Sequence, residues 1–326
     1  MGTKLAPLGL KPILNIEDVS FVGHDLSRPE CVLVQEDGGF YVSHTGGGVT
    51  HIASNGSQTL IGYDGMQAGG SVIIPNGIHR CEDGSFLIAN IGDGGGIWKL
   101  DAAGSLSGHL MEVSGVFLSA ANFVTQDAWG RTWITVSTVS QPRFKAYSDQ
   151  VRDGLIVVED QGKAKIVCDD VCFANECRVS PDGQYLYISE TFARRITRFR
   201  IQEDNSLSQR ETFCQFGYGD FPDGCCFDAS GNLWVTSIVS NRLYCVTPDR
   251  TVHLVIEDAV PEHIDWVEEA LANGKMGREH FYKTAGVKLK NIASVAIGGA
   301  LGKQLFMGSL ADTAIATLTL PDDFKI

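Results

Sequence analysis

The feature that most constrains the fold is a segment that recurs six times along the chain of 326 residues. Each copy is a glycine-containing turn followed by a short run of alternating apolar residues, which is typical of a turn leading into a half-buried β-strand. The copies are DGGFYVS (37–43), DGSFLIAN (83–90), WGRTWITV (129–136), DGQYLYIS (182–189), SGNLWVTS (230–237) and GKQLFMGS (302–309). Their first turn glycines are spaced by 46, 46, 53, 48 and 71 residues. A repeat of roughly 40–50 residues built from short strands predicts a β-propeller.

Each repeat continues with a loop and a second β-rich run, such as GVTHIASNG at 48–56. We therefore expect four strands per blade, one before the shared glycine and three after it. The last blade lacks sequence for a fourth strand, because only Pro321–Ile326 remain after its third. The segment 13–23 is expected to supply that strand, because an open ring would expose two strand edges. The predicted fold class is an all-β, six-bladed β-propeller, a single domain over 1–326 closed by its N-terminal strand.

The longest spacing contains an insertion at 261–286, before the last blade. Pro261 can begin a helix there, and Ile264, Val267 and Leu271 repeat at helical spacing. We therefore expect a short helical insertion.

Composition excludes several classes of protein. The formal net charge of −13 disfavours binding to nucleic acid or to anionic membranes. No apolar run is long enough to span a bilayer, and the first ten residues do not resemble a secretory signal. Nine cysteines, an odd number, are expected to be reduced thiols. We expect a cytoplasmic protein whose partner is a small molecule; the sequence leaves its oligomeric state open.

A polar residue with a side-chain oxygen stands eight positions before each shared glycine, at the expected start of the innermost strand. The six residues are Glu30, Asn76, Asn122, Asn175, Asp223 and Ser294. In a propeller these positions ring the mouth of the central channel. Such side chains could merely cap strand ends, but the full set of six favours a site for a hard cation. The oxygen-only donors favour Ca²⁺, with Mn²⁺, Mg²⁺ or Zn²⁺ as alternatives, although a typical zinc site would contain His or Cys.

Four longer motifs carry a family resemblance. They are RPECVLVQEDGGFYVS, SAANFVTQDAWGRTWIT, ANECRVSPDGQYLYISET and DFPDGCCFDASGNLWVTS. The chain resembles the SMP-30/gluconolactonase/regucalcin family of six-bladed propellers, which hold one divalent metal in the channel mouth. The resemblance implies that Glu30, Asn175 and Asp223 bind the metal, and that Asn122 lies near metal and substrate. Related fluorophosphatases use a similar set of residues.

The resemblance implies a divalent-metal-dependent hydrolase that opens a lactone or related ester in the central channel. The metal would act as a Lewis acid, and Asp223 would be general base, nucleophile or only a ligand. Asn122, as a catalytic residue, and Asn76 would orient the substrate, with His44 and His79 as further substrate-binding candidates. The alternatives are an organophosphate or fluorophosphate hydrolase on the same site and a non-catalytic calcium-binding propeller.

Two insertions are expected to wall the channel mouth. The first strand of every blade should begin on the face that carries the ring residues, and the second strand should end there. The insertion 261–286 precedes a first strand, and the loop 141–154 follows a second strand, so both should lie on that face. The larger insertion offers the aromatic residues Trp266, Phe281 and Tyr282.

Overall fold

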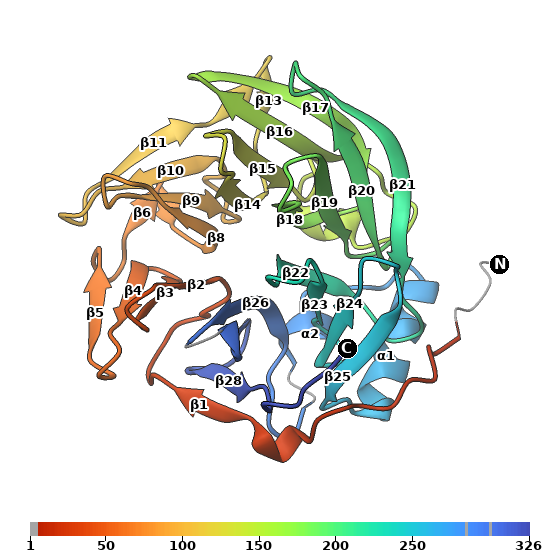
Figure 1. Cartoon of the computed structure of the whole chain (residues 1–326). Coiled ribbons are helices and arrows are strands. Elements are labelled where there is room, and N and C mark those ends of the chain that lie inside the picture. The colour runs from red at the N-terminus through yellow and green to blue at the C-terminus, as the bar shows by residue number, and fades with distance from the viewer. Residues whose placement is uncertain (1–5, 284–285, 300–301) are drawn as a thin grey trace.

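The structure is a computed structural model that describes residues 6–283, 286–299 and 302–326. Within these residues, six four-stranded antiparallel sheets form a closed ring around a central channel (Figure 1). This confirms the all-β, six-bladed propeller that the repeat predicts.

Blades one to three follow the chain from the innermost strand outward. Blade one is β2 (Val32–Val34), β3 (Phe40–His44), β4 (Gly48–Ile52) and β5 (Gln58–Ile61). Blade two is β8 (Pro75–Arg80), β9 (Phe86–Asn90), β10 (Ile97–Leu100) and β11 (Leu106–Leu110). Blade three is β14 (Ala121–Gln126), β15 (Thr132–Val136), β16 (Gly154–Asp160) and β17 (Lys163–Val171).

Blades four to six repeat the arrangement. Blade four is β18 (Ala174–Val179), β19 (Tyr185–Glu190), β20 (Arg195–Ile201) and β21 (Leu207–Gln215). Blade five is β22 (Pro222–Phe227), β23 (Leu233–Ser237), β24 (Arg242–Val246) and β25 (Val252–Glu257). Blade six is β26 (Ile292–Gly298), β27 (Gln304–Ser309), β28 (Ile315–Thr319) and the N-terminal β1 (Ser20–Val22).

The remaining helices and short strands lie in the segments that connect the strands and the blades. Two short hairpins, β6 (Gln67–Ala68) with β7 (Ser71–Val72) and β12 (Glu112–Val113) with β13 (Val116–Phe117), were not predicted from the sequence. The elements of the described residues include the 3₁₀ helices η1 (Ile16–Asp18) and η2 (Arg143–Ala146). The predicted helical insertion forms α1 (Pro261–Ala272) and α2 (Glu279–Tyr282) beside blades five and six (Figure 1). Among the described residues, no helix combines the length and apolar character needed to cross a membrane.

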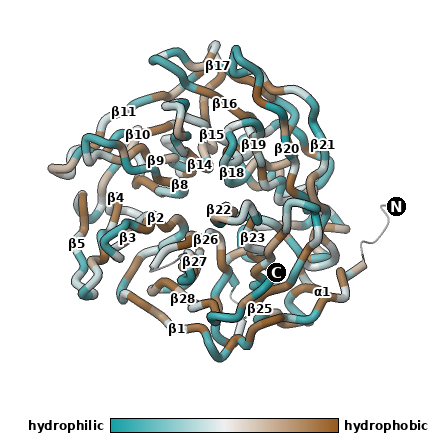
Figure 2. The backbone as a smooth tube through the Cα atoms, in the orientation of Figure 1, coloured by the Kyte–Doolittle hydropathy of each residue, from teal (hydrophilic) through white to brown (hydrophobic). Residues whose placement is uncertain are grey.

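The blades are held together by apolar side chains that alternate along their strands. Figure 2 shows apolar segments recurring along the strands around the whole ring. Trp133 and Trp234, at equivalent positions of β15 and β23, are almost completely buried. Each indole N–H donates to an aspartate of the preceding turn, Asp127 at 2.8 Å and Asp228 at 3.0 Å. The repeated turn therefore also satisfies the one polar atom of a buried tryptophan.

Ring closure involves both ends of the chain. β1 pairs antiparallel with β28, with Phe21 opposite Ala316. The preceding residues also bond to blade five, where the amides of Ile13 and Leu14 donate to Leu254 and Val255 at 3.0 and 2.9 Å. The N-terminal segment thus covers the last strand edge, as predicted, and it also links blade six to blade five.

Deleting residues 1–23 should expose the edge of β28 and remove the contacts to blade five. We expect a lower melting temperature and association in solution, because an unpaired edge recruits other strands. Thermal melting and size-exclusion chromatography beside the full chain measure both effects. A truncated protein with the size and melting temperature of the full chain would contradict this role of β1.

Candidate active site

A pocket lies where the innermost strands begin, and five of the six ring residues line it. These five are at most 5% exposed: Glu30, Asn76, Asn122, Asn175 and Asp223. The sixth, Ser294, is buried but does not line the pocket. Its side chain is the shortest of the set and cannot reach as far into the channel.

A repeated irregularity of the innermost strands lies at the ring positions. In blades two to six, the pairing of the first two strands shifts register beside the ring residue, as between Pro75 and Ile78 or between Pro222 and Cys225. Such bulges bend a strand and redirect a side chain. We attribute the inward direction of the ring side chains to them.

Close packing of the innermost strands also fixes the ring. A Cβ atom on Gly224, the residue after Asp223, would lie 2.4 Å from the carbonyl oxygen of Ala293. A Cβ atom on Gly77, the residue after Asn76, would lie 2.5 Å from the ring of Phe123. Because both distances are too short for a side chain, glycine is required for neighbouring blades to approach this closely.

Glu30 is held by a chain of hydrogen bonds. The Asn76 amide donates to Glu30 Oε1 at 2.8 Å and to the Asn122 carbonyl at 3.0 Å. Arg28 Nη2 in turn donates to Asn76 Oδ1 at 2.7 Å. Both amide hydrogens of Asn76 therefore have protein acceptors, so Asn76 positions Glu30. Asn76 also lines the pocket, so its contact with substrate stays a prediction.

Asn122 and Asn175 are oriented by hydroxyl groups at the ends of second strands. Asn122 Nδ2 donates to Ser137 Oγ at 2.9 Å, which uses one of its two amide hydrogens. Asn175 Nδ2 lies 3.1 Å from Thr191 Oγ1, whose own hydroxyl donates to the Pro222 carbonyl. The amide oxygen of Asn175 consequently faces away from Thr191.

Three buried oxygens in the pocket have no hydrogen-bond partner among the described residues. They are Glu30 Oε2, Asn175 Oδ1 and Asp223 Oδ1. Buried acceptors without a partner are costly, and each of these belongs to a residue that the sequence assigned to the metal. Two carboxylate oxygens and one amide oxygen form a donor set that suits a hard divalent cation. The residues present therefore fit the implied metal.

The pKa values show the electrostatic cost of this arrangement. Burial, only partly offset by the nearby Arg28 and Arg143 charges, raises the pKa of Glu30 to about 7. Burial, and then the charges of Glu30 and Glu176, raise the pKa of Asp223 well above its usual range. A divalent cation between the two carboxylates would remove their mutual repulsion.

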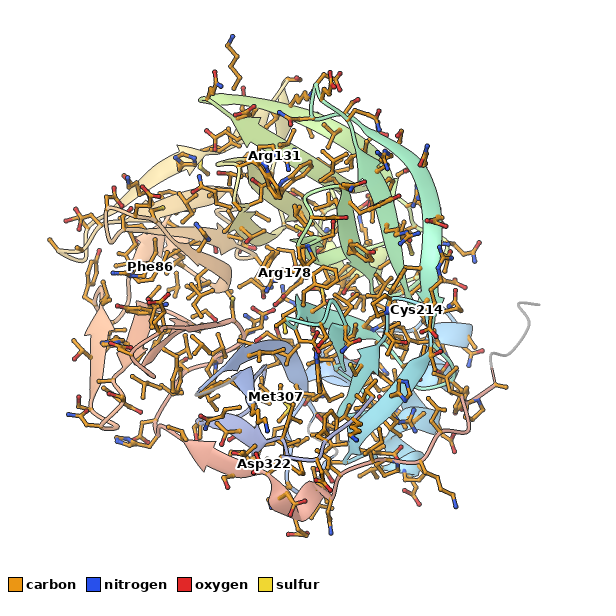
Figure 3. The ribbon with its side chains drawn as sticks, viewed as in Figure 1. Phe86, Arg131, Arg178, Cys214, Met307 and Asp322 are labelled. Atoms are coloured by element: carbon orange, nitrogen blue, oxygen red, sulfur yellow. The ribbon has the colours of Figure 1, made fainter. Side chains whose placement is uncertain are left out.

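An ion pair lies on the inner strand of blade four. Arg178 on β18, near the centre of the ring in Figure 3, pairs with Glu176 at 2.9 Å and packs over the Phe123 ring at 4.4 Å. Glu176 and Arg178 do not line the pocket. Burial, partly offset by Arg178, raises the pKa of Glu176 to about 8.

The two histidine candidates lie outside the pocket lining, so their expected contact with substrate gains no support. His44 Nδ1 lies 2.9 Å from Thr50 Oγ1 on the neighbouring strand. His79 is three residues beyond the ring position on β8, where burial and then Arg178 lower its pKa to about 4. His44 is the last residue of β3 and His79 lies within β8, and neither lines the pocket.

Both predicted insertions contribute to the pocket wall. The loop 141–154 supplies Arg143 and Tyr147, and the insertion 261–286 supplies Phe281 and Tyr282. Trp266 does not line the pocket, because it stacks on His280 at a centroid distance of 4.0 Å. Of the three aromatic residues of the insertion, Phe281 and Tyr282 thus line the pocket and Trp266 does not.

Some lining residues carried no recognised signal in the sequence. Arg28 stands two residues before Glu30 and has a positive φ of 49°, which is uncommon for arginine. Phe173 occupies the equivalent position before Asn175, with a φ of 55°. Thr191 directly follows β19, the second strand of blade four. Counting from the ring residue would have found Arg28 and Phe173, but not their side-chain directions.

Glu268 of α1 anchors the larger insertion to blade four. It forms a bidentate ion pair with Arg194, at 2.5 and 2.7 Å, and accepts the Gly219 amide at 2.6 Å. Arg194 also packs over the Phe221 ring at 4.5 Å. Ile264 and Val267 are buried against the same region. The helix that leads to Phe281 and Tyr282 is thus fixed by one nearly buried ion pair.

The comparisons with known proteins identify the family. The model of the SMP-30/Gluconolactonase/LRE-like region matches residues 75–264, so the chain belongs to this family. A 6-deoxy-6-sulfogluconolactonase from Pseudomonas putida is 32% identical over 174 residues, which are 52% of this chain and 56% of that relative. The chain therefore spans about half the length of this curated relative.

Two solved structures support the fold. A gluconolactonase from Xanthomonas campestris has a TM-score of 0.68 at 18% identity, covering 98% of this chain and 99% of its own. A calcium-binding regucalcin from Agrobacterium tumefaciens has a TM-score of 0.64 at 17% identity, covering 95% and 96%. At these identities the likeness concerns the fold alone.

Replacing Glu30 with Gln should raise the stability of the metal-free protein and weaken its binding of metal. Gln keeps the oxygen that accepts from Asn76 but removes a charge that repels Asp223. In chelator above pH 7, where the metal-free Glu30 carboxyl is largely ionised, the variant should melt about 2 °C or more above wild type. The gain should shrink below pH 7, because the folded state then protonates Glu30.

Calcium should raise the melting temperature of wild type and have much less effect on Glu30→Gln. Glu36→Gln, an exposed change in the next turn, is the matched control. Equal calcium stabilisation of wild type and Glu30→Gln would exclude Glu30 from the metal site.

Replacing Glu268 with Ala should loosen the insertion without touching the ring. Loss of one partner leaves Arg194 nearly buried without its carboxylate, so we expect a destabilisation of about 3 kcal/mol. Urea unfolding measures this change, and the exposed neighbour Glu269→Ala is the control. An unfolding free energy equal to that of the control would show that the ion pair does not anchor α1.

Proposed function

We propose that this protein is a divalent-metal-dependent lactonase whose active site is the pocket at the channel mouth. The observation that carries the proposal is the set of three unpartnered buried oxygens on Glu30, Asn175 and Asp223. Membership of the gluconolactonase-like family supports lactone opening over organophosphate hydrolysis. The lactonase relative from Pseudomonas putida supports the same reaction class.

We propose Ca²⁺ as the preferred ion. Its ligands are oxygens, and the proposed set contains two carboxylates and one amide carbonyl. Among the described residues, no group of three or more His, Cys, Asp or Glu side chains is arranged to hold a metal. The site therefore depends on the Asn175 amide, a ligand better suited to calcium than to zinc. When bound, the cation supplies Lewis acidity for the lactone carbonyl.

Asp223 is the proposed general base. Its carboxylate lines the pocket. With Oδ1 assigned to the cation, the other oxygen, Oδ2, can accept a proton from a water molecule. The water oxygen attacks the carbonyl carbon, the ring C–O bond breaks, and the proton passes to the departing ring oxygen. The product is one open-chain hydroxy acid.

The remaining pocket groups position the substrate. The second amide hydrogen of Asn122, which has no acceptor among the described residues, can donate to a substrate oxygen. The aromatic rings of Tyr147, Phe173 and Phe281 give one wall an apolar surface that limits access of bulk water. Asn76 acts through Glu30, as a positioning residue.

Replacing Asp223 with Asn should lower kcat by at least about a hundredfold, the usual scale for loss of a general base. Asn retains an oxygen ligand, so calcium should still raise the melting temperature, though less than in wild type. Steady-state hydrolysis of gluconolactone with and without chelator measures the effect, with the exposed change Asp323→Asn as control. A calcium-loaded Asp223→Asn enzyme with wild-type kcat would assign the base to another group.

A further inference from the structure

Two arginine side chains line the pocket beside the proposed metal ligands. Arg28 precedes Glu30 by two residues, and Arg143 lies on η2. Neither forms an ion pair with a carboxylate of the described residues, although Glu30 and Asp223 line the same pocket. The Nε atom of each is buried without a hydrogen-bond partner within the described part of the chain. Two guanidinium groups thus lie in the pocket without a paired anion.

Neutral acceptors hold both guanidinium groups in place. Arg28 donates to Asn76 Oδ1 at 2.7 Å and to the Pro75 carbonyl at 3.3 Å. Arg143 donates to Ser137 Oγ at 3.1 Å and packs over the Phe173 ring at 4.9 Å. These contacts fix the side chains without an ion pair. In the absence of a cation, the charges of the two arginines are offset at longer range by the carboxylates of Glu30 and Asp223.

The charge balance of the pocket predicts an anion. A divalent cation would compensate the carboxylates of Glu30 and Asp223, and the charges of Arg28 and Arg143 would then remain. Isolated charges in a low-dielectric site are costly unless an opposite charge meets them. Consistent with a positive local field, the charge of Arg28 lowers the pKa of Tyr282 at the pocket rim. The chain as a whole is acidic, with a formal net charge of −13, so this field is local.

We propose that the substrate carries, besides its lactone ring, an anionic oxyanion group that Arg28 and Arg143 bind. The group is a carboxylate, sulfonate or phosphate, because a planar guanidinium pairs with two oxygens of each. This inference rests on the proposed lactonase function and adds the substrate class. The Arg residues are substrate-binding residues, while the ring-opening chemistry stays with Asp223.

Matched pairs of lactones test the proposal. Gluconolactone is compared with the same lactone bearing a carboxylate, a sulfonate or a phosphate in place of its terminal hydroxyl, using calcium-loaded wild type. We expect at least one charged lactone to have a kcat/KM roughly 10- to 100-fold above that of the neutral one, the scale of a charge-assisted hydrogen bond. The difference should lie mainly in KM and should shrink as ionic strength rises. The three charged arms identify which oxyanion is preferred.

Arg143→Gln should reduce the preference for charged over neutral lactones at least tenfold. Arg143→Lys should reduce it less, because lysine keeps the positive charge but lacks the planar guanidinium group that pairs with two oxygens. Lys145→Gln is the matched control, since it removes an exposed positive charge from the same 3₁₀ helix and should leave the preference unchanged. Arg28→Gln is the second variant, with a melting curve to detect disturbance of Asn76 and Glu30. A merely structural role would change the neutral and charged substrates equally.

An inhibition measurement on wild type tests the proposal even if the arginine variants fail to fold. A sugar sulfonate without a lactone ring should inhibit gluconolactone hydrolysis competitively, whereas the corresponding uncharged sugar alcohol should inhibit at least tenfold more weakly. If wild type opens no lactone, the proposed function fails. If wild type opens neutral and charged lactones equally well and the sulfonate does not inhibit preferentially, the proposed substrate class fails while the lactonase function stands.

Discussion

Repulsion between two buried carboxylates, Glu30 and Asp223, is the interaction around which the site is organised. Each is nearly inaccessible to water, and burial raises the pKa of both. Folding would not favour two such groups in one pocket unless another charge compensated them. Arg28 and Arg143 offset part of this cost. The proposed divalent cation would offset more of it and would also give the unpartnered amide oxygen of Asn175 a partner.

The propeller makes this costly arrangement rigid. The ring residues lie where the innermost strands bulge, and glycines such as Gly77 and Gly224 let neighbouring strands pack without a side chain between them. Closure by β1 covers the last strand edge, so the ring does not open to relieve the repulsion. This packing keeps Glu30 and Asp223 at one pocket, where the proposed cation would bind.

The repeat in the sequence predicted the blades, the closing strand and the ring, because each of these depends on backbone period and position. Five of the six ring residues line one pocket, but Ser294 does not. The prediction was made from the position of each residue in its blade and did not consider that the serine side chain is shorter than the others. His44 and His79 were expected to contact substrate, but neither lines the pocket, and Trp266 stacks on His280 instead. The hairpins β6–β7 and β12–β13 have strands of two residues, too short to give an alternating pattern. The sequence did not identify Arg28 as a pocket residue, because no motif indicates its left-handed backbone conformation, on which the direction of its side chain depends.

Anomalous diffraction from crystals soaked in Mn²⁺, a hard cation with similar oxygen ligands, tests the central claim most directly. The account predicts one strong anomalous peak in the pocket, within coordination distance of Glu30 Oε2, Asn175 Oδ1 and Asp223 Oδ1. It also predicts that excess Ca²⁺ removes the peak. A pocket without anomalous density at saturating Mn²⁺, or a peak that contacts none of these three oxygens, would contradict the account.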